Sequence, residues 1–264
     1  MNKVRKARSV LTEEGVGSLA RKTVESVFPD IITDSYRTRI WPRLPVRANY
    51  GTYNDVEIKG THPMYLDPAA DTEIQHRLLD RIIPLNTPSH IPNFKQTNVT
   101  QIKQTYQNGD RVVIIGGGNG VSAIHSARQV GKEGEVIIYE ADSDRMEDIE
   151  RTIEHNCKAD ICQTNLAVVG QPYHVETMGK AGNIDPSCLP NCTALEMDCE
   201  GAELDILKAL EQQPDTIIVE LHHKKEFAPY STATEVRTLL ETMGYSVERH
   251  DGPWVDGLLR AEQG

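Results

Sequence analysis

A glycine-dense segment between two apolar runs constrains the fold of this chain more than any other feature. Residues 111–115 (Arg-Val-Val-Ile-Ile) have the composition of a buried strand, and glycines follow at 116, 117, 118 and 120. Residues 121–130 have helical periodicity, and a second apolar run at 136–139 ends in Glu140. Glycine lets a backbone turn sharply and approach a ligand closely, because it has no Cβ. This order predicts a strand–loop–helix–strand unit that binds a ligand over the loop.

The loop and the acid after it predict a nucleoside cofactor. The helix presents unpaired N–H groups and its positive dipole end to whatever lies over the loop. Glu140 stands about 20 residues beyond the glycines, where a carboxylate accepts both hydroxyls of a ribose. The spacing is Gly-x-Gly-x-Gly, and Val121 occupies the place of the third glycine in dinucleotide sites. This shorter spacing favours a cofactor without a pyrophosphate, such as S-adenosylmethionine. A glycine-rich turn that binds nothing is the alternative.

Composition excludes several classes of function. The 264 residues carry a net charge of −11 and have a pI near 5.3, which argues against general affinity for nucleic acid or anionic membranes. No run of 18 apolar residues is present, so we expect no membrane span. The basic start leads into Leu11-Thr-Glu-Glu14 rather than an apolar stretch, so we expect no signal peptide. These features predict a soluble cytoplasmic protein.

The five cysteines are predicted to be free thiols. Cys157 and Cys162 form one pair in the sequence, Cys188 and Cys192 form a second, and Cys199 stands alone. Structural zinc sites use cysteine pairs at such spacings. However, Cys162 falls in an expected strand, and neither pair lies in a Gly/Pro-rich knuckle. We therefore predict no zinc site.

The chain divides near residue 105. Residues 1–105 are predicted to form an N-terminal extension of helices and loops, with one helix in residues 1–30 and another at Asp71–Ile82. This extension could pack against the cofactor domain, cover a substrate site or make a homo-oligomer contact. Residues 106–264 are predicted to form the cofactor-binding domain. Strands and helices alternate there, which is the signature of an α/β fold with a doubly wound parallel sheet. Residues 170–192 are predicted to be a loop.

Two later strands end in a cluster of acids and histidines. Asp198 ends the expected strand at 193–198 and Glu200 follows it, whereas Glu220, His222 and His223 close the next strand. Ligands of open parallel sheets bind at the carboxyl ends of the strands. Acids beside a histidine at such an edge can orient a hydroxyl or share its proton. The alternative is that Asp198 and Glu200 only cap the helix that follows.

At this point the sequence resembles a known family. Residues 198–207 (Asp-Cys-Glu-Gly-Ala-Glu-Leu-Asp-Ile-Leu) are similar to the Asp-Val-Glu-Gly-Ala-Glu-x-x-x-Leu signature of FkbM-type S-adenosylmethionine-dependent O-methyltransferases. The resemblance runs from about Gly109 to the C-terminal hairpin and includes Glu140, Asn165-Leu-Ala167, Glu220-Leu-His222 and Met243-Gly-Tyr245. It implies a class I fold, a Rossmann-like doubly wound seven-stranded sheet with a terminal antiparallel hairpin. In one departure, Ile114 stands where the family has an aspartate that helps to hold the methionine end of the cofactor.

The resemblance implies methyl transfer from S-adenosylmethionine to a hydroxyl of a small-molecule, glycan or lipid acceptor. The predicted catalytic residues are Asp198, Glu220 and His222, and the predicted substrate-binding residues are Glu200 and His223. The predicted cofactor-binding residues are Gly116, Gly117, Gly118, Asn119, Gly120, Glu140, Ala141, Asn165 and Asp198.

Three alternatives remain open. The oxygen ligands of Asp198, Glu200 and Glu220 suit Mg²⁺, but the start of the helix also accounts for these acids, so we predict no metal. An NAD-dependent oxidoreductase could use the same fold, although no Tyr/Lys or Cys/His catalytic set is evident. A non-catalytic methyltransferase-like binding domain is the third alternative, and Ile114 favours it.

Overall fold

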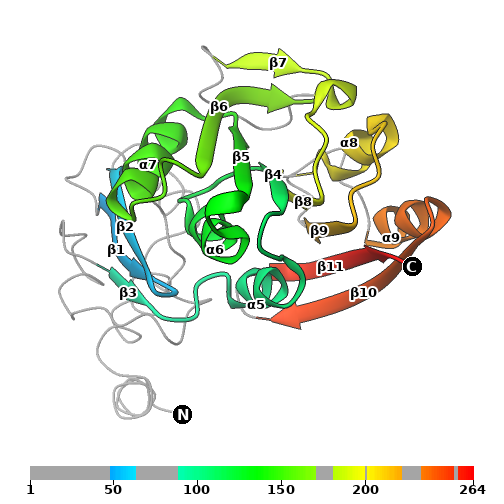
Figure 1. Cartoon of the computed structure of the whole chain (residues 1–264), viewed down its shortest axis with the longest axis horizontal. Helices are drawn as coiled ribbons and strands as arrows, with labels where there is room; N and C mark the ends of the chain where they lie inside the picture. The colour runs from blue at the N-terminus through cyan, green and yellow to red at the C-terminus, as the bar shows by residue number, and fades with distance from the viewer. Residues whose placement is uncertain (1–47, 64–88, 171–180, 200, 222–232, 253–254) are drawn as a thin grey trace, which may run out of the picture.

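An eight-stranded sheet lies at the centre of the protein (Figure 1). The computed structural model describes residues 48–63, 89–170, 181–199, 201–221, 233–252 and 255–264. The sheet has the order β10 (Tyr245–Gly252), β11 (Val255–Gln263), β9 (Thr216–Glu220), β8 (Ala194–Met197), β4 (Arg111–Ile115), β5 (Glu135–Glu140), β6 (Cys162–Val169) and β7 (Gly182–Ile184). The strands from β9 to β7 pair in parallel, and β11 is antiparallel to both of its neighbours.

This topology confirms the predicted doubly wound sheet with a terminal antiparallel hairpin. The chain runs outward from β4 through β5 and β6, then returns to the other side of β4 to form β8 and β9. The strand order therefore reverses between β4 and β8, and ligands of such sheets bind at this point of reversal. The eighth strand, β7, was not predicted. Residues 182–184 lie at the edge of the sheet and read Gly-Asn-Ile, which has little of the apolar, β-branched character of a buried strand.

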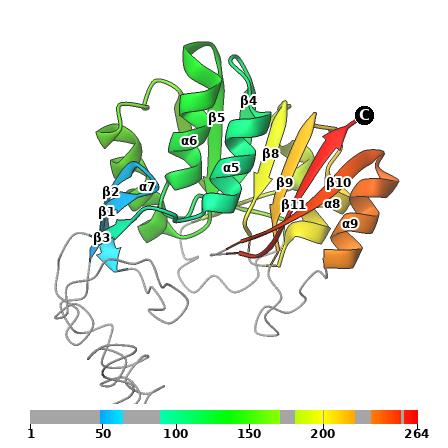
Figure 2. The ribbon, with the colours of Figure 1, turned by 90° about the horizontal axis from the view of Figure 1, so that it is seen from below.

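Helices cover both faces of this sheet (Figure 2). One face packs against α5 (Gln96–Thr105), α6 (Val121–Val130) and α7 (Ser143–His155), and the other against α8 (Glu203–Ala209) and α9 (Ala233–Thr242). The turn η3 (Gly131–Glu133) follows α6, and η4 (Pro186–Cys188) follows β7. In β4, Val112 and Ile114 belong to the first core, whereas Val113 and Ile115 belong to the second. Burial on both faces explains why residues 112–115 of β4 are an uninterrupted apolar run.

A second, three-stranded sheet lies beside α6 and α7. It has the order β2 (Val56–Pro63), β1 (Ala48–Tyr53) and β3 (Ser89–Ile91). Asn54 and Asp55 connect β1 to β2 with positive φ angles of 45° and 61°, the conformation that a two-residue hairpin turn requires. Tyr53, Val56, Ile58 and Ile91 are buried and extend the core on the α5–α7 side. The small sheet is therefore part of the folded body and not a separate unit.

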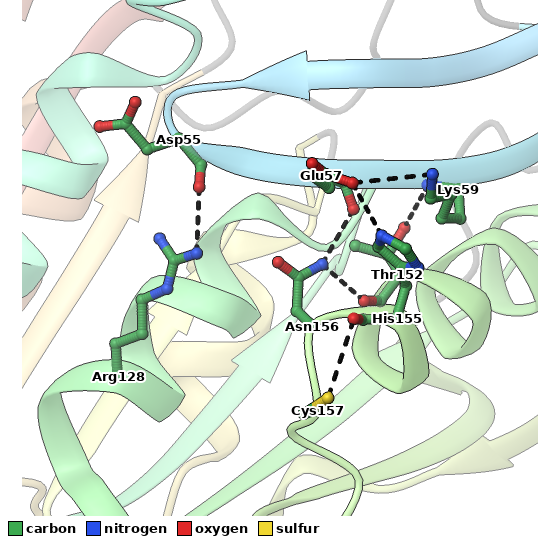
Figure 3. Close-up of polar contacts among 8 residues, drawn as sticks. All are labelled: Asp55, Glu57, Lys59, Arg128, Thr152, His155, Asn156 and Cys157. Atoms are coloured by element: carbon green, nitrogen blue, oxygen red, sulfur yellow. Dashed lines mark hydrogen bonds and ion pairs between the residues drawn. The ribbon is translucent and has the colours of Figure 1, made fainter.

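Polar contacts fix the small sheet to the helices (Figure 3). The amide of Asn156, at the end of α7, donates to the backbone oxygens of Glu57 (2.9 Å) and Thr152 (2.8 Å). The His155 ring lies 2.7 Å from the Glu57 carboxylate, and Arg128 on α6 donates to the backbone oxygen of Asp55 at 3.0 Å. Most of these contacts use backbone atoms of the hairpin, so they hold its position with little dependence on its side chains.

The proposed division at residue 105 stays a prediction, but α5 packs on the main sheet. Val99 and Ile102 of α5 are fully buried in the core that α6 and β4 share. The predicted helices in residues 1–30 and 71–82 lie outside the described residues. Within the described ranges, no helix has the length and apolar character that crossing a membrane requires.

Candidate active site

The glycine loop between β4 and α6 has the backbone conformation that its sequence requires. Gly116, Gly118 and Gly120 have positive φ angles of 87°, 58° and 84°. At Gly116 a side chain is also excluded, because a Cβ atom would lie 1.9 Å from the backbone oxygen of Asp198. At Gly118 a Cβ atom would meet no other atom within 4 Å. The loop is thus packed against the end of β8 at Gly116 and open at Gly118, where a ligand can approach the backbone.

The remaining loop residues join it to the helix. Gly117 lies against the side chains of Ile138 and Ile149, and Asn119 is buried. Gly120 is the N-cap of α6, and because it has no side chain it offers no capping oxygen to the first turn. The first turn of α6 contains no acidic residue either. Its unpaired N–H groups and positive dipole end favour a polar or anionic ligand group over the loop.

Glu140, at the end of β5, bridges to this loop. Its carboxylate accepts a hydrogen bond from the backbone N–H of Gly118 at 3.2 Å. It also accepts from the N–H groups of Ala141 (2.9 Å) and Asp142 (3.0 Å). Burial raises the pKa of Glu140, and these three N–H groups oppose that shift. The carboxylate is therefore held in one orientation beside the open part of the loop, where a ribose hydroxyl could replace the Gly118 contact.

Ala141 and Asn165 flank Glu140. Ala141 follows it directly and contributes the N–H described above. Asn165 lies on β6 opposite Tyr139 and is partly exposed, and its amide nitrogen is 3.5 Å from the backbone oxygen of Ile138. Both residues are thus within one strand position of Glu140 in the register of the sheet.

The acids at the ends of β8 and β9 meet a lysine that the sequence analysis did not identify. Lys95 pairs with the Asp198 carboxylate, and its Nζ lies 3.4 Å from Oε2 of Glu220. The three side chains are 14%, 16% and 8% exposed, respectively. Burial alone would lower the pKa of Lys95, but the two carboxylates outweigh this effect and raise it. Lys95 is therefore a permanent ammonium ion in contact with two predicted site residues.

Two buried polar residues extend this cluster into the core. Asn98, on the first turn of α5, donates to Oε2 of Glu220 at 3.2 Å and is fully buried. Glu196, on β8, is 1% exposed. Burial raises its pKa, against the opposing influence of Ser122, Lys95 and Asn98. Oδ1 of Asn98, Oε2 of Glu196 and Oγ of Ser122 are buried without a hydrogen-bond partner. Burial therefore makes Glu196 harder to ionise than an exposed glutamate.

The contacts of α8 weigh against helix capping as the explanation for Asp198. The helix begins after Ala202 and has no side-chain cap there. Glu203, which is buried, instead accepts from the N–H of Gly201 at 3.1 Å and so stabilises the turn before the helix. Asp198 instead makes an ion pair with Lys95, which is not part of α8. Among the described residues of the Glu-Gly-Ala-Glu core, Glu203 thus supports the helix start.

Some of the predicted site residues cannot be placed. Glu200, His222 and His223 lie outside the described residues. Ile114 is described and is a core residue, with no exposed surface. It lies opposite Glu196 in the register of β4 and β8. In the parts of the chain that are described, no group of three or more His, Cys, Asp or Glu residues could hold a metal ion, and the five cysteines are free.

The structure brings together most of the predicted site. The glycine loop, Glu140 and the strand-end acids Asp198 and Glu220 all follow the carboxyl ends of β4, β5, β8 and β9, at one edge of the sheet. Lys95, Asn98 and Glu196 were missed. Glu196 left a signal, because it is a charged residue in an otherwise apolar strand. Lys95 and Asn98 left none, since residues 84–100 contain no motif.

Comparison with known proteins finds a family match over part of the sequence. Residues 189–247 match the family described as the Methyltransferase FkbM domain. The matched segment begins in the loop before β8 and ends in β10, so it contains Asp198, Glu203 and Glu220. The resemblance to FkbM methyltransferases is therefore confirmed over this segment, and the predicted cofactor, S-adenosylmethionine, agrees with it. No curated protein matches the sequence significantly.

Solved structures with a similar arrangement include several methyltransferases. An S-adenosylmethionine-dependent O-methyltransferase from Thermotoga maritima is 14% identical, with a TM-score of 0.48, and the match covers 71% of each chain. A precorrin-6y C5,15-methyltransferase from Geobacter metallireducens is 13% identical, with a TM-score of 0.45, over 66% of this chain and 88% of the other. At these values the similarities do not bear on substrate or mechanism.

Proposed function

We propose that this protein transfers the methyl group of S-adenosylmethionine to a hydroxyl group of a small-molecule, glycan or lipid acceptor. One observation carries the proposal: the glycine loop, the acid Glu140 and the strand-end carboxylates Asp198 and Glu220 lie at one edge of the sheet. The FkbM match includes the strand-end part of this arrangement.

The cofactor side of the site is built from the loop and Glu140. The open space at Gly118 admits a ligand to the backbone, and the N-terminus of α6 presents unpaired N–H groups to it. Glu140 is already oriented by two N–H groups besides that of Gly118, so it can accept hydroxyl groups without reorganisation. Val121, which is buried, occupies the position that a dinucleotide loop gives to glycine. These features support S-adenosylmethionine over NAD.

The acceptor side would be formed by the ends of β8 and β9. When bound, S-adenosylmethionine supplies an electrophilic methyl carbon on a sulfonium group. In the proposed transfer the acceptor oxygen bonds to this carbon as the carbon–sulfur bond breaks, and the hydroxyl proton leaves to a base. Glu220 is our candidate to receive the proton, and Asp198 is our candidate to orient the hydroxyl. Alignment of the two reacting atoms would provide most of the acceleration, and a base would add about 100-fold or more.

The acceptor class is inferred from the net charge of the chain and from the two carboxylates at the site. The net charge of −11 disfavours a nucleic-acid acceptor. The two strand-end carboxylates can accept hydrogen bonds from a hydroxyl group, and this supports an alcohol or sugar hydroxyl as the acceptor.

Calorimetric titration tests the proposal first. S-adenosylmethionine should bind to the purified protein, and NAD should not. Binding of NAD alone would instead support an oxidoreductase. A second step incubates the protein with isotope-labelled S-adenosylmethionine and sets of sugars, lipids and small alcohols. For acceptors that carry hydroxyl and carboxyl groups but no amino group, labelled product that survives mild alkali and releases its label as iodomethane with hydriodic acid is a methyl ether, whereas a methyl ester is hydrolysed by the alkali. Binding of the cofactor without transfer to any hydroxyl would support the non-catalytic alternative.

A further inference from the structure

Lys95 enters the candidate site from outside the segment that carries the motifs. It precedes α5, and it stands 103 residues before Asp198 in the sequence. Its φ angle is 49°, in the left-handed region, which is uncommon for a residue with a side chain. Such strained positions persist only where surrounding contacts hold them, and they cluster at functional sites. The backbone at Lys95 is therefore held in place by what its side chain and the helix start contact.

The contacts of Lys95 join two strands. Its ammonium group pairs with Oδ2 of Asp198 after β8, and lies 3.4 Å from Oε2 of Glu220 at the end of β9. Asn98, one turn further along α5, donates to the same oxygen of Glu220 at 3.2 Å. A single turn of chain thus contacts both strand-end carboxylates at once.

The charges at this edge require a cation. Three carboxyl groups, those of Glu196, Asp198 and Glu220, act on the Lys95 ammonium. Like charges at close range in a partly buried site repel one another strongly. Without Lys95, Asp198 and Glu220 would lose the cation between them. The repulsion between the two carboxylates would then favour protonation of one of them or rotation of its side chain away from the other.

We propose that Lys95 is a positioning residue, whose ammonium group holds the carboxylates of Asp198 and Glu220 together at the acceptor side of the site. We call this contact of Lys95 with the two carboxylates the clamp. The inference rests on the proposed function. In this proposal Lys95 and the first turn of α5 complete the acceptor side of the site, and Asn98 provides a second contact to Glu220. Lys95 does not act as a base, because an ammonium flanked by two carboxylates does not release its proton at neutral pH.

The first test needs no acceptor. The carboxyl carbons of aspartate and glutamate are labelled with ¹³C, and their NMR signals are followed from pH 3 to pH 9 in the protein and in Lys95→Met. Methionine keeps the length of the side chain and removes the charge. We expect the Asp198 or Glu220 signal to titrate at a higher pH in Lys95→Met. Lys103→Met, which removes an exposed lysine from the same helix, should leave both signals unchanged. Unchanged titration in Lys95→Met would refute the clamp.

The second test measures catalysis with the acceptor found by the labelling screen. Lys95→Met should lower kcat about 100-fold, the effect of a displacement of reacting groups by about 1 Å. Its dissociation constant for S-adenosylmethionine should stay within a few-fold of that of the unmodified protein. Added ethylammonium should partly restore kcat in Lys95→Ala, because it supplies the missing cation. Wild-type kcat in Lys95→Met, or loss without ethylammonium rescue in a folded Lys95→Ala, would overturn the role. A protein that binds no S-adenosylmethionine would instead contradict the proposed function, while the NMR result would still report on the clamp.

Discussion

Glu140 has two roles at the scale of a single residue. It organises the glycine loop through Gly118, and we assign to it the ribose of the cofactor. Glu140→Ala should weaken binding of S-adenosylmethionine by about 1.5–3 kcal/mol, the range for a hydrogen bond to a charged group. Calorimetry gives this value directly. Glu154→Ala removes an exposed acid from α7 and serves as the control. Equal affinities of Glu140→Ala and the control would remove Glu140 from the cofactor site.

Ile114 is a core residue, and this decides what an acid would do at its position. It has no exposed surface and lies opposite the buried Glu196. Ile114→Asp should therefore lower the free energy of unfolding by several kcal/mol, because it buries a second carboxyl group without a partner. Ile114→Val should cost only about 0.5–1.5 kcal/mol. Urea unfolding compares the two variants. A stable Ile114→Asp protein with tighter cofactor binding would mean that the side chain reaches the loop.

Glu196 should make stability depend on pH. Burial raises its pKa in the folded protein, so the folded state binds a proton more strongly than the unfolded state. Its contribution to stability is complete below the unfolded value of about 4.5 and is lost as the pH rises through the folded pKa. Glu196→Gln keeps the shape and cannot ionise, so it should become progressively more stable than the unmodified protein as the pH rises above about 4.5. Glu211→Gln, at an exposed acid, should not. A constant difference between Glu196→Gln and the unmodified protein would mean that Glu196 is not protonated.

At the scale of elements, the glycine loop permits a matched comparison. A Cβ atom at Gly118 meets nothing within 4 Å, and neither does one at Gly109, yet both glycines have positive φ. Alanine at either position should thus cost about 1–2 kcal/mol of stability through backbone strain alone. Only Gly118→Ala should also weaken binding of S-adenosylmethionine, because its methyl group would enter the ligand space. Melting curves and calorimetry on both variants separate the two effects. Equal cofactor affinity in both variants would place the ligand elsewhere.

Elements with a local signature could be predicted from the sequence, and the clamp could not. The strand, glycines, helix and acid of residues 111–140 are neighbours in the chain, so their spacing specifies both the fold and Glu140. Lys95 and Asn98 meet Glu220 across more than one hundred residues, and no periodicity in the sequence reports such a contact. Strand β7 was missed for a related reason, since pairing with β6 and not its own composition makes it a strand.

At the scale of the whole molecule, the small N-terminal sheet is joined to the main body partly through His125. This residue is on α6 and is 2% exposed, and its ring Nε2 lies 2.8 Å from the backbone oxygen of Asn54 in the hairpin turn. That oxygen can only accept, so the neutral ring donates from Nε2. Arg128 contacts the next residue of the same turn. One of the hydrogen bonds that hold the sheet against α6 therefore comes from a neutral, buried histidine ring.

Burial of His125 predicts that acid weakens the docking of the small sheet, because a protonated ring would place a charge in the core. Burial lowers the pKa of His125 to about 4. The charges of Arg128 and Lys103 contribute to this shift, whereas the hydrogen bond to Asn54 and the charge of Asp55 oppose it. Since the unfolded value is about 6.5, the unfolded state binds the proton more strongly, and stability is complete above pH 6.5 and falls as the pH approaches 4. A difference of this size corresponds to about 3 kcal/mol at most. His125→Gln can still donate to Asn54 and cannot titrate, so it should lose less stability between pH 6.5 and pH 5.

Hydrogen exchange locates this effect within the molecule. In the unmodified protein, the amides of β1 and β2 should lose protection between pH 6.5 and pH 5, after correction for the intrinsic exchange rate, before those of β4 and β5 do. His155→Gln is the matched control, because it removes a second histidine at this junction, whose contact with Glu57 is exposed. If His125→Gln and the unmodified protein lose protection in β1 and β2 to the same extent, His125 does not control the docking. The acid sensitivity of the small sheet would then have to come from other groups at the junction.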